Sequence, residues 1–168
     1  MSDTGSSPVK GSLLIITLLR DGVPVVFTAS GRSMRPFVRD GDRLTVDPAA
    51  VAGLSRGDIG LYCYGEENLV AHRCLGPLQP PRGPGFRFRG DAVIGPVEIL
   101  SRGQILGKVT GLTRDGRNIP LESAWRRLGV RLWLAGYPLR EAARPARQGA
   151  ARLAALVRRY FQRGTRSR

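Results

Sequence analysis

Glycine and proline recur at short intervals through the first 120 residues, and this punctuation limits the fold more than any other feature of the sequence. Both residues are unfavourable inside helices, and both favour turns. The apolar runs between them are short, such as VPVVFTA at 23–29 and DRLTVDP at 42–48. The pattern therefore predicts a mainly β fold. A chain of 168 residues is long enough for one such domain and an appendage.

Turn signals and apolar periodicity place the expected elements along the chain. Alternation of apolar and polar residues is typical of a half-buried strand, and an Asp-Gly pair between two such runs is typical of a hairpin. The sequence predicts a loose segment at 1–9, a helix over about 10–20 that ends at Asp21-Gly22, strands within 23–29 and 42–48, a hairpin of 57–64 with 68–76, a strand at 86–92, and a last hairpin over 104–121 that turns at Asp115-Gly116.

The net charge of +14 is concentrated near the C-terminus. Residues 1–124 carry 15 basic and 12 acidic side chains, whereas residues 125–168 carry 12 arginines and the single acid Glu141. Two sets of apolar residues in this region have helical spacing. The tail is therefore predicted to be amphipathic and helical, and either to pack on the β domain or to lie on an anionic membrane surface. The two sets are Trp125, Leu128, Leu132 and Trp133, and Leu153, Leu156, Val157, Tyr160 and Phe161.

Neither a membrane span nor a metal site is expected. The longest apolar run of the N-terminal region, SLLIITLL at 12–19, is far below the roughly 20 residues of a spanning helix, and it lacks the features of a signal peptide. Cys63 and Cys74 are the only cysteines, too few for a metal site. We expect two free thiols, with a disulfide between adjacent strands as the alternative, and no cofactor.

The stretch GRSMRPF at 31–37 raises the question of a serine nucleophile at Ser33. A serine hydroxyl needs a base within hydrogen-bond reach, because it is a poor nucleophile at neutral pH. Arginine stays protonated and cannot serve. The candidates are therefore the carboxylates, the two lysines and the only histidine, His72. His72 shares one face of a predicted strand with Val70 and Cys74. Histidine is the side chain that most often serves as a general base.

Five blocks of sequence, taken together, resemble the catalytic core of the signal-peptidase and LexA-like serine peptidase superfamily. The blocks follow the family's order over about residues 22–112 and read VVFTASGRSMRPFVRDGDRLTV, RGDIGLYCY, NLVAHRCLG, FRFRGDA and ILGKVTGL. The resemblance implies a mostly β domain of coiled, partly barrel-like sheets. It also implies cleavage of a peptide bond in a substrate bound as an extended strand, with Val25, Phe27 and Phe37 available to line the groove.

By this resemblance Ser33 is the nucleophile, and Met34 and Pro36 shape its turn. Family members use either a lysine or a histidine followed by arginine as the base. The block AHRC matches the histidine type, and Lys108 lies in a late structural strand, so His72 is the implied general base. The backbone N–H of Ser33 is then the natural donor to an oxyanion.

A third catalytic residue is less clearly marked. The resemblance suggests that Asp91, in the Gly-Asp pair after the strand at 86–89, orients His72, although the same pair could form a structural turn. Relatives of the histidine type carry a further aspartate a few residues later, where this chain offers Glu98 as the nearest carboxylate. Some relatives also place a serine where this chain has Gly31.

These observations predict a loose segment and short helix at 1–21, a signal-peptidase-like catalytic domain at 22–122 and a basic tail at 123–168. The implied function is a serine endopeptidase that removes a leader or signal segment, in the cytoplasm or at the inner face of the membrane. Two alternatives stay open. One is an inert or regulatory peptide-binding module, and the other is nucleic-acid binding through the tail, for which the sequence lacks a recognition pattern.

Overall fold

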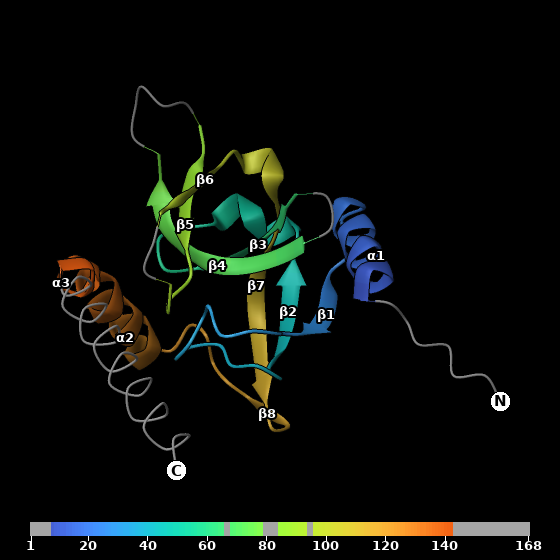
Figure 1. The fold of residues 1–168 in the computed structure, drawn as a ribbon. Coiled ribbons are helices and arrows are strands. Elements are labelled where there is room, and N and C mark those ends of the chain that lie inside the picture. Colours follow the sequence, from blue (N-terminus) through green and yellow to red (C-terminus); the bar gives the residue numbers. More distant parts are fainter. Residues whose placement is uncertain (1–7, 66–67, 79–83, 94–95, 143–168) are drawn as a thin grey trace, which may run out of the picture. The chain divides into compact units, whose positions relative to one another are not determined.

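The computed structural model describes residues 8–65, 68–78, 84–93 and 96–142, and an antiparallel sheet of eight strands dominates it (Figure 1). The strands are β1 (Val25–Thr28), β2 (Arg43–Asp47), β3 (Ile59–Tyr64), β4 (Asn68–Pro77), β5 (Phe86–Arg89), β6 (Glu98–Leu100), β7 (Ile105–Arg114) and β8 (Arg117–Asn118). Their order is β1-β2-β7-β3-β4-β5-β6, and β8 pairs with β7. The prediction of a mainly β fold is confirmed, and the described strands do not close into a barrel.

Register shifts bend this sheet at three places. They fall between Thr45 and Val46, between Leu61 and Tyr62, and between Cys74 and Gly76. Irregularities of this kind increase the local twist of a strand pair. The long strand β4 is correspondingly curved in Figure 1, and it pairs with β3 along its first half and with β5 along its second half.

Two hydrophobic cores follow from this bend. The larger core includes Leu44, Val46, Leu61 and Leu112, all almost fully buried. The smaller core contains Tyr62, Cys74 and Phe88, which have no exposed surface. The Cβ position of Gly60 lies 2.7 Å from the ring of Phe88, so only glycine at position 60 leaves room for that ring. The site described below lies where β3 and β4 contribute to both cores.

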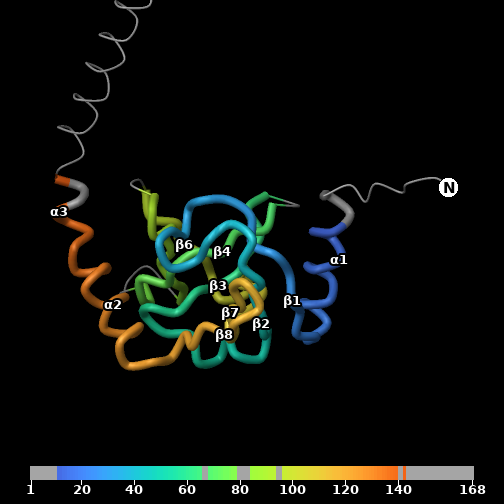
Figure 2. The backbone as a smooth tube through the Cα atoms, turned by 90° about the horizontal axis from the view of Figure 1, so that it is seen from below, coloured from blue at the N-terminus to red at the C-terminus, as the bar shows by residue number. Residues whose placement is uncertain are grey.

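Helix α1 (Pro8–Arg20) packs against β1 and β7 through Ile16 and Leu19. Figures 1 and 2 both show it beside β1. The predicted stop at Asp21-Gly22 is confirmed. Gly22 has a φ of +81°, its N–H donates to Leu19, and the N–H of Val23 donates to Leu18. This is the Schellman arrangement, which favours glycine because the conformation is left-handed.

The predicted hairpins are also present. β3 and β4 pair from Ile59 with Arg73 to Tyr64 with Asn68. β7 and β8 turn at Asp115 and Gly116, whose φ angles of 50° and 75° are both positive. Two positive φ angles are the signature of the type I′ turn, which is why the Asp-Gly pair predicted the corner correctly. Two short 3₁₀ helices, Ala49–Gly53 and Arg102–Gln104, complete the loops.

The C-terminal region begins with two helices, α2 (Ala124–Ala135) and α3 (Tyr137–Ala142). The chain divides into two compact units, Met1–Arg131 and Leu132–Arg168. The first unit thus extends further than the predicted catalytic domain at 22–122, because it includes both α1 and the first part of α2. On α2, Trp125, Leu128 and Leu132 are exposed. The second predicted amphipathic set, Leu153 to Phe161, lies outside the described residues.

Within the described ranges, no helix is both long enough and apolar enough to cross a membrane.

Candidate active site

Ser33 lies in the loop at 29–42, which joins β1 to β2 and is closed by its own hydrogen bonds. The N–H of Ala29 donates to the carbonyl of Asp42 over 2.7 Å, and the N–H of Gly31 donates to Oδ1 of Asp40 over 2.8 Å. Met34 and Val38 anchor the middle of the loop in the larger core. Gly31 has a φ of +102°, a conformation that glycine adopts without strain. We refer to residues 29–42 as the serine loop.

A second segment holds Ser33 from the other side. The carbonyl oxygen of Ser33 accepts a hydrogen bond of 2.7 Å from the N–H of Ala92, which follows β5. An ideal Cβ on the neighbouring Gly90 would lie 2.8 Å from that carbonyl oxygen and 3.1 Å from Nε2 of His72. Ser33 and the Nε2 side of His72 therefore approach the same backbone position. A side chain at position 90 would therefore require the Ser33 carbonyl or the His72 ring to shift.

His72 lies on β4 opposite Gly60 of β3, and its side chain is almost fully buried. Its Nδ1 is 2.8 Å from Oε2 of Glu98 and 2.9 Å from the hydroxyl of Tyr62. The Tyr62 hydroxyl also donates to Glu98. A carboxylate can only accept, so it favours the imidazole tautomer with its proton on Nδ1. That tautomer leaves Nε2 unprotonated, on the side of the ring that lies near Gly90 and the carbonyl oxygen of Ser33.

Burial and the hydrogen bond to Glu98 both raise the pKa of Tyr62. The phenol therefore keeps its proton at neutral pH and well above it, and it acts in this cluster as a donor. Glu98 thus receives hydrogen bonds from two groups, which hold its carboxylate in one orientation beside the imidazole. Tyr62, His72 and Glu98 thus form one hydrogen-bonded cluster.

The two predicted catalytic residues line one cavity of about 670 Å³. Ser33, His72 and Glu98 are at its wall, and most of the remaining wall is apolar. Among the described residues, neither the hydroxyl nor the backbone N–H of Ser33 has a hydrogen-bond partner. The N–H predicted to bind an oxyanion is therefore unused. The apolar lining includes Phe27, Val38, Leu44, Leu61 and Leu69.

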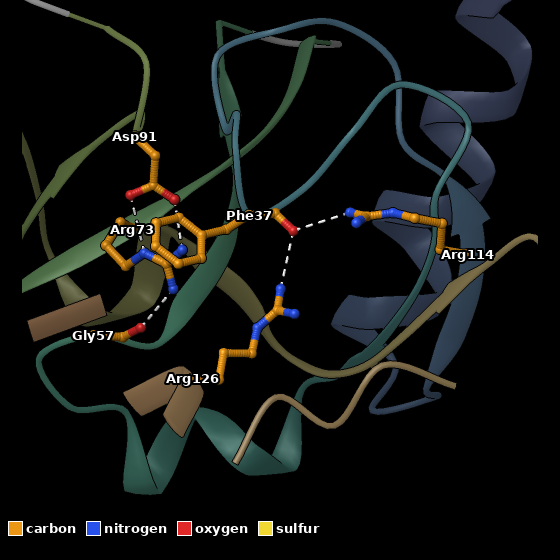
Figure 3. Close-up of polar contacts among 6 residues, drawn as sticks. All are labelled: Phe37, Gly57, Arg73, Asp91, Arg114 and Arg126. Carbon is orange, nitrogen blue, oxygen red and sulfur yellow. Dashed lines mark hydrogen bonds and ion pairs between the residues drawn. The ribbon is translucent and has the colours of Figure 1, made fainter. Parts of the chain in front are cut away.

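Asp91 does not have the position that was expected of it. Its Oδ1 and Oδ2 accept from Nε and Nη2 of Arg73 at 3.1 and 2.5 Å, and both side chains are buried (Figure 3). The carboxylate in contact with Nδ1 of His72 is therefore that of Glu98 and not that of Asp91. The reason lies in the register of β5 and β6, which pairs Phe88 with Glu98 and brings the Glu98 carboxylate within reach of His72 on β4.

The rival base Lys108 lies in the same row of the sheet as His72, since both pair with Gly60. Its ammonium group, however, forms an ion pair of 3.0 Å with Asp58 and does not line the cavity that contains Ser33. Of the groove residues suggested by the resemblance, Phe27 lines the cavity, whereas Val25 is part of the core. Phe37 does not line the cavity either and has other contacts, described below.

The two cysteines are free, as expected. Cys63 packs on the larger core and Cys74 belongs to the smaller one. Burial raises the pKa of the Cys74 thiol to about 11. Two thiols in separate cores do not form a disulfide, so the alternative is excluded in this structure.

Comparisons with protein-family models, with curated proteins and with solved structures found no match to this chain.

Proposed function

We propose that this protein is a serine endopeptidase that resembles signal peptidase I and the LexA-like peptidases, with Ser33 as nucleophile and His72 as general base. The proposal rests on one observation above all. Glu98 and Tyr62 engage Nδ1 of His72, and the other ring nitrogen, Nε2, lies beside Gly90, as does the carbonyl oxygen of Ser33. The bent antiparallel sheet is consistent with the coiled, partly barrel-like sheets of that superfamily.

The chemistry would follow from these positions. Ser33 Oγ attacks the carbonyl carbon of the scissile peptide bond while its proton passes to Nε2 of His72. Glu98 stabilises the imidazolium that forms, without taking its proton, and the N–H of Ser33 donates to the developing oxyanion. Collapse of the tetrahedral intermediate returns the proton from Nε2 to the leaving amine. Water, activated by the same imidazole, then hydrolyses the acyl-serine ester.

The substrate we propose is a leader or signal segment bound as an extended strand in the cavity. The apolar wall suits uncharged side chains, since a charged group would lose its hydration there. We further propose that the arginine-rich C-terminal region holds the protein at the anionic inner face of the membrane from the cytoplasmic side.

An inert or regulatory peptide-binding module is the second candidate. The observation that favours it is the lack, among the described residues, of a hydrogen bond from the Ser33 hydroxyl to His72. Such bonds are often long in the absence of substrate and tighten only in the complex. The cavity and the Tyr62, His72 and Glu98 cluster are common to both candidates, so turnover decides between them.

Covalent labelling distinguishes the peptidase from the inert peptide-binding module. A serine-directed phosphonate probe, read by intact-protein mass spectrometry, should add one adduct to the wild type and none to Ser33→Ala. In His72→Ala the labelling rate should fall by about 10²-fold or more, since the general base is lost. Equal labelling rates in wild type and His72→Ala would refute the base assignment. Absence of any adduct, with peptide binding retained, would support the inert module.

A further inference from the structure

Phe37, in the serine loop, is contacted by three arginines from three different elements (Figure 3). Its carbonyl oxygen accepts from Nη2 of Arg114 at 3.2 Å and from Nη2 of Arg126 at 2.9 Å. Its ring lies 5.0 Å from Cζ of Arg73 and 6.0 Å from Cζ of Arg126, within the range of cation–π attraction. Phe37 is only four residues beyond Ser33, so these contacts bear on the nucleophile.

Two of the three arginines have carboxylate partners of their own. Arg73 binds Asp91 and the carbonyl of Gly57, and Arg114 binds Asp42 at the end of the serine loop with two hydrogen bonds of 2.8 and 2.7 Å. Arg126 is different. Within the described part of the chain it forms no ion pair, and its side chain donates to the carbonyl of Phe37.

Placing Arg126 there is electrostatically unfavourable. Burial lowers the pKa of Arg126, and the neighbouring charges of Arg73 and Arg114 lower it further, although the carboxylates of Asp42 and Asp91 partly oppose this shift. The contacts of Arg126 with Phe37 help to offset the remaining cost.

The contacts of Phe37 also connect the serine loop to the strand that carries His72, the proposed base. Arg73 directly follows His72 on β4, and its guanidinium, fixed by Asp91, lies against the Phe37 ring. Arg126 contacts the same residue from the first turns of α2. Phe37 is therefore held between the strand that carries the base and a helix from the region that the sequence assigned to the tail.

We propose that Arg126 is a positioning residue, which holds Phe37 and thereby keeps the serine loop in the conformation that presents Ser33 to His72. Arg126 touches neither the cavity nor the reacting atoms. This inference deepens the proposed peptidase function and rests on it for its kinetic consequences. Its structural part, the restraint of the serine loop by α2, can be tested without any activity.

The kinetic test compares Arg126→Gln with Arg127→Gln in the full-length chain. Arg127 is the matched control, because it is the next residue of the same helix and is exposed in an ion pair with the exposed Glu122. We expect kcat for a cleaved peptide to fall about 10- to 100-fold in Arg126→Gln with a smaller change in KM, since small misplacements of reacting groups lower kcat. Arg127→Gln should match wild type, and Arg126→Lys should recover part of the loss.

The structural test is hydrogen–deuterium exchange of the same variants. Amides at 30–38 should exchange faster in Arg126→Gln than in wild type and in Arg127→Gln, while amides of β3, β4 and β7 stay protected. Unchanged exchange at 30–38 would overturn the inference. Faster exchange throughout the sheet would also overturn it, because Arg126 would then support the fold in general rather than the loop.

The two proposals can fail separately. If wild type and Ser33→Ala behave alike on every peptide, the peptidase function fails, and the exchange experiment alone decides whether Arg126 restrains the loop. If wild type cleaves a peptide and Arg126→Gln retains its full kcat, the positioning role fails and the peptidase function stands. Phe37→Leu, which keeps the carbonyl acceptor and removes the ring, should show a milder form of the Arg126→Gln exchange pattern.

Discussion

Oε2 of Glu98 lies 2.8 Å from Nδ1 of His72, across the gap between two strands that are not hydrogen-bonded neighbours in the sheet. β5 lies between β4 and β6 and ends at Arg89, which pairs with Arg73. Because β5 does not extend as far as His72, the carboxylate of Glu98 reaches the imidazole beyond the end of β5. This relationship defines the tautomer of the only histidine in the chain. It also separates the roles of the two carboxylates that sequence alone left in competition.

Glu98 and Asp91 should respond differently to the loss of charge. Glu98→Gln is expected to fold normally and to lose about 10²- to 10⁴-fold in kcat, because the imidazolium and its tautomer are no longer stabilised. Asp91→Asn is expected to lose about 3–5 kcal/mol of unfolding free energy, because it leaves the buried charge of Arg73 without its partner. Peptide kinetics and urea unfolding of both variants check this. A stable, inactive Asp91→Asn protein would return the orienting role to Asp91.

The tautomer of His72 can be read directly, since no other histidine contributes to the spectrum. In ¹⁵N-histidine-labelled protein near neutral pH, the imidazole shifts should show the proton on Nδ1. Tyr62→Phe should keep this tautomer, because Glu98 still accepts from Nδ1, and Glu98→Gln should change it. A wild-type spectrum with the proton on Nε2 would leave His72 unable to act as the base.

The Cys74 thiol gives a pH dependence of stability. Its pKa is about 11 in the folded protein against an ordinary value of 9.0, so folding favours the protonated thiol. A pKa raised in the folded state adds stability that is fully present below the ordinary value and is lost as the pH rises toward the folded value. The difference in unfolding free energy between wild type and Cys74→Ala should therefore shrink between about pH 9 and about pH 11.

Reactivity provides an independent check on the same thiol. In a Cys63→Ser variant, Cys74 is the only thiol and has no exposed surface. A thiol reagent at about pH 8 should modify it only after urea unfolds the protein. Fast modification in the native state would show that the smaller core opens readily.

The arginine-rich region should bind anionic vesicles. The full-length chain is expected to float with phosphatidylglycerol vesicles and to be released by high salt, because attraction between arginines and anionic lipid is screened. A chain that ends at residue 142 keeps Arg126 and the described helices and should stay at the bottom of the gradient. Equal flotation of the two chains would remove the C-terminal region as the membrane contact. Binding to neutral vesicles would point to the exposed apolar residues of α2 instead.

Local signals predicted the strands and turns well. The Asp115-Gly116 corner was predictable because few residue pairs adopt two positive φ angles, and Gly22 marked the end of α1 for a similar reason. Alternation predicted that His72 shares one face of its strand with Cys74, and both side chains are buried. Each of these features depends on residues close together in the sequence.

Features that depend on strand register were not predictable. The pairing of β5 with β6 and of β4 with β5 determines whether Asp91 or Glu98 contacts His72. No local sequence pattern encodes either register. The contacts of Phe37 have the same origin, since arginines from three distant elements meet there. The contact of Arg126 with the serine loop was not predictable either, because nothing near Arg126 in the sequence indicates it.

Peptide cleavage by the purified full-length protein tests the central claim most directly. A library of leader and signal peptides would be read by mass spectrometry with wild type, Ser33→Ala, His72→Ala and the double variant. We predict that wild type cuts some of these peptides, that each single variant loses roughly 10³-fold or more, and that the double variant is no worse than either, since residues that act as one unit are not additive. Retained cleavage in His72→Ala, with loss in Lys108→Ala, would contradict the assignment of Ser33 and His72 as the catalytic pair.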